Sequence, residues 1–119
     1  MYLKSYKELI VWQKSIQLVK EIYRLTNNFP KSETYGLSSQ MQRAVISIPS
    51  NIAEGYSRKN LKEYIHFLHI SYGSSAELET QLKISKKLQF GIEEDRKKAD
   101  QILQEVMRML NKLTQSLKP

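Results

Sequence analysis

The sequence contains no cysteine, four glycines, three prolines and a single tryptophan. Without cysteine the chain cannot form disulfides, iron–sulfur clusters or thiolate zinc sites. Glycine and proline are too scarce for the many tight turns of a β-sandwich. No apolar run approaches the ~20 residues that cross a bilayer, and the first residues do not resemble a signal peptide. These absences predict a cytoplasmic protein without membrane association.

Apolar residues recur at intervals of three and four in four stretches of the 119-residue chain, which is the spacing of one face of an α-helix. The stretches run from about Tyr6 to Asn28, from Ser32–Thr34 to Gly55, from Asn60 to about Leu88, and from about Glu93 to Leu117. Short connections make consecutive helices antiparallel. The sequence therefore predicts one all-α domain over residues 1–119, an antiparallel up-down four-helix bundle.

Local signals refine the second and third helices. Pro49 lies inside the second apolar pattern, where a missing donor and a crowded carbonyl predict a kink. Two short helices with a break are the alternative, and the periodicity that continues through Ile52 favours the kink. Asn60 and Glu63 have the spacing of a capping box. The small residues 73–76 interrupt the third helix and predict close packing against a neighbour, because glycine alone costs a helix ~1 kcal/mol.

The apolar positions exceed what one bundle core needs. In the first stretch the predicted core face is Leu9, Trp12, Ile16, Val19 and Tyr23, with Leu18 and Leu25 among the residues beside it. The apolar residues left over are Ile10, Val11, Ile22, Ile46, Tyr64, Phe67 and Ile70. A second apolar stripe suggests a subunit interface. We therefore expect a homo-oligomer.

One pattern suggests a metal site. Glu63 and His66 form the Glu-x-x-His spacing of di-iron bundles, and His69 could join them. Di-iron chemistry needs two such motifs and two further carboxylates, whereas this chain has one motif. Two nearby helical histidines are more often surface or interface residues. We predict no metal and no cofactor.

Paired carboxylates suggest a second kind of site. Glu54, Glu77 and Glu79 resemble the acid and base of a glycosidase, but ion pairs with Arg43, Arg58 or nearby lysines explain them equally well. No nucleophile elbow, glycine-rich loop or Walker motif accompanies the serines. The sequence therefore predicts that the protein is not an enzyme.

The charge balance points to polyanions. The chain has 19 basic and 12 acidic residues, a formal charge of +7, which favours nucleic acid or anionic lipid as a partner. A well-solvated basic surface is the alternative, and lysines at a helix C-terminus also suit the helix dipole. A further group, Arg96, Lys97 and Lys98, is interpreted as simply solvated. The candidate nucleic-acid contacts are Arg43, Arg58, Lys59, Lys62, Lys83, Lys86 and Lys87.

Several motifs resemble one protein family. They are VWQK (11–14), FP (29–30), YGL (35–37), QMQRA (40–44), SIPSNIAEG (47–55) and YGSSAELETQL (72–82). Together they resemble the four-helix-bundle proteins encoded within intervening sequences of bacterial 23S rRNA genes, which some classifications file as small-subunit ribosomal proteins. The resemblance also extends to the accessory proteins of diversity-generating retroelements. Gln42 departs from the pattern, in which another basic residue usually stands beside Arg43.

This resemblance implies a basic ring, typically a homopentamer, with no established enzymatic activity. The leading hypothesis is a non-enzymatic oligomer that binds nucleic acid, with structured RNA, including rRNA, favoured over DNA. The alternative is a protein-interaction scaffold that recruits a partner enzyme such as a reverse transcriptase.

Overall fold

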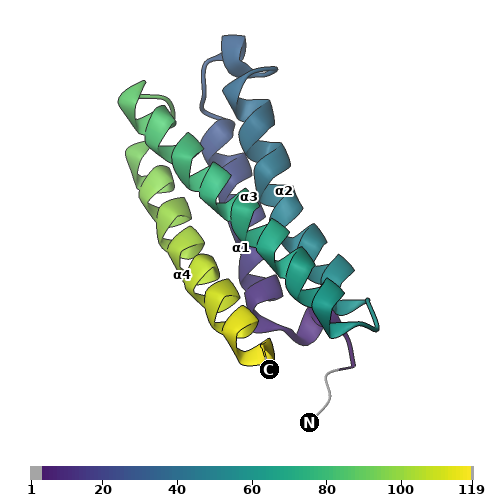
Figure 1. Cartoon of the computed structure of the whole chain (residues 1–119). Helices are drawn as coiled ribbons and strands as arrows, with labels where there is room; N and C mark the ends of the chain where they lie inside the picture. The colour runs from purple at the N-terminus through teal and green to yellow at the C-terminus, as the bar shows by residue number, and fades with distance from the viewer. Residues whose placement is uncertain (1–3, 119) are drawn as a thin grey trace.

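The computed structural model describes residues 4–118. Its helices are α1 (Ile10–Thr26), α2 (Leu37–Tyr56), α3 (Leu61–Lys87) and α4 (Glu93–Leu117), and the 3₁₀ turns η1 (Tyr6–Glu8) and η2 (Lys31–Glu33) precede α1 and α2. Helices α1 and α3 each pack against both α2 and α4. Figure 1 shows the four helices side by side in a body with extents of 45 × 23 × 22 Å. The predicted all-α four-helix bundle is confirmed.

The ends of the bundle collect different connections. The α1–α2 and α3–α4 connections lie at one end, and the α2–α3 connection lies at the other, beside the start of α1 and the end of α4 (Figure 1). Gly91 lies in the α3–α4 connection and packs against the α1–α2 side of the same end. An added Cβ there would meet the side chains of Leu25 and Phe29. A Cβ at position 91 would lie 2.7 Å from Leu25 Cδ1, and the positive φ of 79° also favours glycine there.

The core face of α1 differs from the predicted one. The buried apolar residues are Val11, Leu18, Ile22 and Leu25, with Ser15 between them. Ile16 and Tyr23, both predicted in the core, are each 42% exposed, whereas Leu9, Trp12 and Val19 are partly buried at its edge. The expectation that Val11 and Ile22 were left over is therefore wrong. Apolar side chains occupy most of the circumference of α1. Their spacing therefore predicted a helix but did not identify which side faces the core.

Helix α2 begins later than predicted. Its first residue is Leu37, and the carboxylate of Glu33 accepts a hydrogen bond from the Leu37 N–H at 3.1 Å. Neither Ser32 nor Thr34 caps the helix, because the segment before it forms the 3₁₀ turn η2. Glu33 satisfies one of the free N–H groups of the first turn from outside the helix.

Helix α2 continues without a break through Pro49, so the alternative of two short helices is wrong. The kink itself stays a prediction. Beside the proline, α3 approaches closely: Ser71 Oγ donates to the Ile48 carbonyl at 2.9 Å, and the hydroxyls of Ser47 and Ser74 lie 2.8 Å apart. Within the small residues 73–76, Ser74 and the buried Ser75 confirm the expected close packing, whereas Gly73 meets no neighbour within 4 Å.

The start of α3 follows its predicted signal. Asn60 caps the helix, and its side-chain oxygen accepts from the Glu63 N–H at 3.2 Å. Helix α4 begins at Glu93 and ends at Leu117, as predicted. Its buried residues include Ala99, Ile102 and Val106, three of the predicted core positions.

Candidate nucleic-acid interface

The seven predicted contacts do not form one surface. Arg58, Lys59 and Lys62 lie around the α2–α3 connection, whereas Lys83, Lys86 and Lys87 lie near the C-terminus of α3. At 1.5 Å per residue, the 21 residues of helix from position 62 to position 83 separate the two clusters by about 30 Å. Arg43 lies apart from both, in a polar groove between α2 and α3. The bundle therefore has two basic ends and an isolated arginine.

At the α2–α3 end, Arg58 is held by its own neighbours. Its guanidinium lies 3.3 Å from the Glu54 carboxylate and 5.1 Å from the centre of the Phe67 ring. An ion pair and a cation–π contact together reduce what this arginine can offer a ligand. Lys59 and Lys62 are exposed nearby. Among residues 4–118 this end provides two lysines without an ion pair, and one arginine that is already paired.

Arg43 lines a polar groove between α2 and α3. The other lining residues include Gln40, Ser47, Ser74 and Glu77. Arg43 is exposed, and it makes no ion pair with Glu77 or with any other residue between 4 and 118. The groove mixes donors with a carboxylate, so it does not present a purely positive surface.

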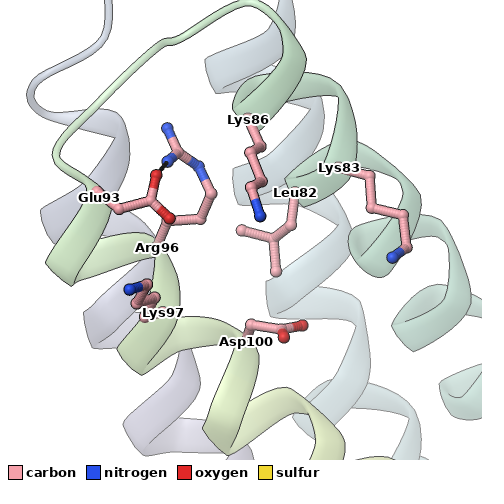
Figure 2. Close-up of a pocket in the computed structure, with 7 residues that line it drawn as sticks. All are labelled: Leu82, Lys83, Lys86, Glu93, Arg96, Lys97 and Asp100. Atoms are coloured by element: carbon pink, nitrogen blue, oxygen red, sulfur yellow. Dashed lines mark hydrogen bonds and ion pairs between the residues drawn. The ribbon is translucent and has the colours of Figure 1, made fainter.

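A cleft between the end of α3 and the start of α4 gathers more basic side chains. It has a volume of about 120 Å³, and its walls are formed by Leu82, Lys83, Lys86, Glu93, Arg96, Lys97 and Asp100. Figure 2 shows Lys86 extending from α3 toward the middle of the cleft, while Lys83 points toward its outer edge. A second hollow, lined by Lys83, Lys86, Lys87 and Gln89, adjoins it. All three predicted lysines of α3 therefore line connected surface depressions.

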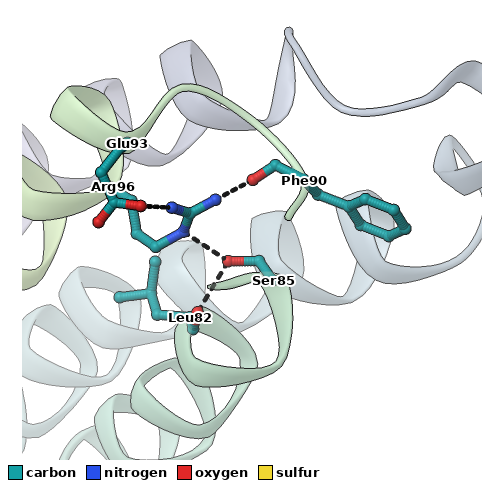
Figure 3. A network of polar contacts seen from close by, with 5 residues as sticks. All are labelled: Leu82, Ser85, Phe90, Glu93 and Arg96. Atoms are coloured by element: carbon teal, nitrogen blue, oxygen red, sulfur yellow. Dashed lines mark hydrogen bonds and ion pairs between the residues drawn. The ribbon is translucent and has the colours of Figure 1, made fainter. Parts of the chain in front are cut away.

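The cleft is built on a buried arginine. Arg96 is 6% exposed, and its Nη1 lies 2.5 Å from the Glu93 carboxylate. Its Nε donates to Ser85 Oγ at 3.2 Å, and its Nη2 donates to the Phe90 carbonyl. Ser85 Oγ in turn donates to the Leu82 carbonyl at 2.8 Å (Figure 3). This network ties the start of α4 to the end of α3 and holds one positive charge below the surface.

Sequence reasoning missed the role of this arginine. Arg96 was grouped with Lys97 and Lys98 as a solvated cluster, which is wrong for Arg96, whereas Lys97 and Lys98 are exposed. Arg96 is buried, and Lys98 lies 3.6 Å from the buried carboxylate of Glu21. Lys97 alone is exposed without an ion pair between residues 4 and 118. The spacing of Glu93 and Arg96 signals an ion pair, but only the packing of α3 against α4 buries the arginine.

The carboxylates once considered for catalysis are engaged elsewhere. Glu54 pairs with Arg58, as the ion-pair interpretation predicted. Glu77 accepts from Gln81 Nε2 at 3.2 Å, and Glu79 accepts from Gln104 Nε2 at 2.7 Å. His66 packs edge-on against Phe67. In residues 4–118, no three side chains of the metal-binding types are grouped as an ion would require.

Within the described part of the chain, none of the helices has the length and apolar character needed to span a bilayer.

Comparison with known proteins assigns the fold and the motifs to one family. The family model described as "23S rRNA-intervening sequence protein" matches residues 7–112. The chain belongs to this family. A solved structure from Bacteroides thetaiotaomicron, described as a protein of unknown function from the S23 ribosomal protein family, shares 21% identity with a TM-score of 0.79. The match covers 89% of this intervening-sequence protein and 96% of the Bacteroides chain.

That likeness shows a common fold. No curated protein matches the chain. The predicted family and architecture are therefore confirmed.

Proposed function

We propose that this protein is a non-enzymatic, oligomeric bundle that binds the phosphate backbone of structured RNA through the basic surface at the C-terminal end of α3. The observation that carries the proposal is the α3–α4 cleft, where Lys83, Lys86 and Lys97 join a buried Arg96. The family description, which refers to 23S rRNA, favours RNA over DNA.

The chemistry of this surface suits backbone recognition. Lysine ammonium groups are mobile point charges that neutralise phosphates without distinguishing bases. Binding of this kind releases counterions and weakens steeply with salt. In a homo-oligomer, and in the pentameric ring that the family resemblance implies, each protomer would repeat the same weak contacts around the axis. Avidity would then raise the overall affinity.

A salt titration with two matched variants tests the proposal. The probe is a fluorescent hairpin of ribosomal RNA, and its dissociation constant is measured by anisotropy over a range of salt concentrations. We expect a steep negative slope of log affinity against log salt for the wild type. Lys86→Glu with Lys87→Glu should make the slope shallower by about one for each phosphate that the two lysines neutralise in the wild type.

The control is Lys59→Glu with Lys62→Glu, which changes the net charge by the same amount at the opposite end. It should leave most of the slope in place. A wild-type affinity that is independent of salt contradicts RNA binding. Equal losses from the two double variants contradict the assignment to the α3 end.

An apolar groove supports the second candidate, a protein-interaction scaffold. Tyr6, Trp12, Ile16, Val19, Ile46, Pro49, Ser50 and Ala53 line a groove of about 320 Å³ between α1 and α2. Ile16 and Ile46 are 42% and 44% exposed there. A scaffold would retain its protein partner after nuclease treatment and after charge reversal of Lys86 and Lys87. Loss of the captured protein under either condition argues for the RNA function instead.

A further inference from the structure

The α3–α4 cleft has an unusual balance of charge for a surface depression. Its four cationic side chains are Lys83, Lys86, Arg96 and Lys97, and its two acidic ones are Glu93 and Asp100, which leaves a net charge of +2. From this balance, and resting on the proposed RNA binding, we infer that the cleft binds a terminal phosphate monoester at the end of an RNA strand.

The charge of the ligand follows from the charge of the cleft. A phosphate monoester carries about −1.5 to −2 near neutral pH, whereas each phosphate inside a strand carries about −1. A net charge of +2 at one small site matches the monoester. The internal backbone would leave part of that charge uncompensated. Lysines spread along an open face would instead meet successive phosphates one at a time.

The size of the cleft also fits a single phosphate group. Its volume is about 120 Å³, several times the ~10–15 Å³ that is enough for one water molecule on the same measure. This space holds a tetrahedral anion with some of its water. The cleft therefore has room for one phosphate group.

Arg96 makes the cleft a fixed site. A guanidinium has five N–H donors, and Arg96 uses three of them on Ser85, Glu93 and Phe90. One N–H on each terminal nitrogen has no other partner in residues 4–118. The carboxylate and the carbonyl hold the buried guanidinium in place, so its position at the base of the cleft is fixed. A buried, oriented guanidinium loses little side-chain entropy on binding.

Lys86 is the residue to test, because its side chain extends toward the middle of the cleft (Figure 2). It is exposed, so a change to glutamine should not disturb folding. Arg96 is unsuitable for this purpose because it also connects α3 to α4. Lys20, on α1 and outside the cleft, provides a control with the same chemical change.

The experiment compares one RNA hairpin in three forms, with a 5′-phosphate, with a 3′-phosphate and with hydroxyls at both ends. Affinity is measured at constant ionic strength. For the wild type we expect one phosphorylated form to bind about tenfold more tightly than the hydroxyl form, the equivalent of one additional charge-assisted hydrogen bond. Lys86→Gln should abolish this preference, and it should also weaken binding of the hydroxyl form, because Lys86 belongs to the surface proposed to bind the backbone. Lys20→Gln should retain the preference.

The outcomes separate the two proposals. If all three hairpins bind the wild type equally, the end-recognition proposal is wrong and RNA binding stands. If none of them binds, the proposed function fails and takes the inference with it. Inorganic phosphate, added against chloride at equal ionic strength, should displace the phosphorylated hairpin. If it binds in the cleft while the hairpins show no preference, the ligand is a free anion and the strand end is excluded.

Discussion

Two glycines in neighbouring helices have opposite surroundings. Gly73 lies on the exposed side of α3, where an added Cβ would meet nothing within 4 Å. Gly55, near the end of α2, is buried, and a Cβ there would lie 2.8 Å from Phe67 Cβ and 3.1 Å from the Tyr64 carbonyl oxygen. The small residue is required at position 55 by packing within the chain, but not at position 73.

Alanine substitutions should therefore act in opposite directions. Gly73→Ala should raise the free energy of unfolding by up to about 1 kcal/mol, because alanine is the better helix former. Gly55→Ala should lower it by about 1–3 kcal/mol through overpacking. Urea unfolding followed by circular dichroism measures both. Destabilisation by Gly73→Ala would indicate that something outside the chain packs closely against this face of α3.

Tyr64 should titrate later than an ordinary tyrosine. Burial, with a smaller contribution from the negative charge of ionised Tyr56, raises the pKa of Tyr64 from 10.0 to about 12. In the unfolded chain this tyrosine ionises near pH 10, before it does in the folded protein. The contribution of Tyr64 to the free energy of unfolding is therefore fully present below pH 10 and is lost as the pH rises toward 12. Phenolate absorbance should show a late step that Tyr64→Phe removes. A single transition near pH 10 in the wild type would contradict the assignment.

At the scale of elements, Arg96 connects two helices and the turn between them. Its hydrogen bonds reach Ser85 on α3, Phe90 in the turn and Glu93 on α4. In the same turn, Gln89 and Gly91 have positive φ angles of 59° and 79°. The arginine stabilises this connection by satisfying the Phe90 carbonyl and compensating the Glu93 carboxylate.

Removal of the guanidinium should be costly. Arg96→Met should destabilise the protein by about 1–2 kcal/mol, since it leaves the Phe90 carbonyl without its donor, while the half-exposed Glu93 carboxylate can be hydrated. Lys97→Met, one residue along and exposed, is the control and should change stability by less than about 0.5 kcal/mol. Thermal unfolding measures the difference, and amide exchange should increase most between residues 85 and 96. Equal effects from the two variants would contradict the role of Arg96.

The ends of the helices were predictable where the signal is local. Asn60 and the acidic start of α4 lie within a few residues of the helix that they begin, so α3 and α4 were located correctly. The start of α2 was missed because its N-cap is Gly36, and the side chain that accepts from the first helical N–H belongs to Glu33, three residues before that cap. A carboxylate that reaches across a 3₁₀ turn has no simple sequence signature.

At the scale of the whole molecule, several large apolar side chains are exposed on the outside of the bundle. Ile10, Ile16 and Tyr23 on α1 and Ile46 on α2 are between 42% and 62% exposed. Ile16 and Ile46 line the α1–α2 groove, and Tyr23 follows Ile16 by two turns of α1, so these three form an apolar stripe, whereas Ile10 lines a separate hollow against α4. Exposed apolar stripes of this kind are typical of subunit interfaces.

Self-association should depend on this stripe. Sedimentation equilibrium should give a mass that is a multiple of 14.0 kDa for the wild type. Ile16→Glu with Ile46→Glu should shift the equilibrium to the monomer, because the charges cannot be buried without partners. Leu61→Glu, at the exposed start of α3, should leave the mass unchanged. A wild-type protein that is monomeric at high concentration contradicts the oligomer.

The sequence alone determined the class of fold, the number of helices, the positive charge and the family, because periodicity, caps, composition and motifs are properties of short segments. Tertiary structure decided which side of α1 is buried, where Val11 and Ile22 replaced Ile16 and Tyr23. It also divided the predicted basic residues between two ends and buried Arg96 beside Lys86. Burial and proximity depend on helices that are distant in sequence, and no local pattern records which side chains those helices bring together.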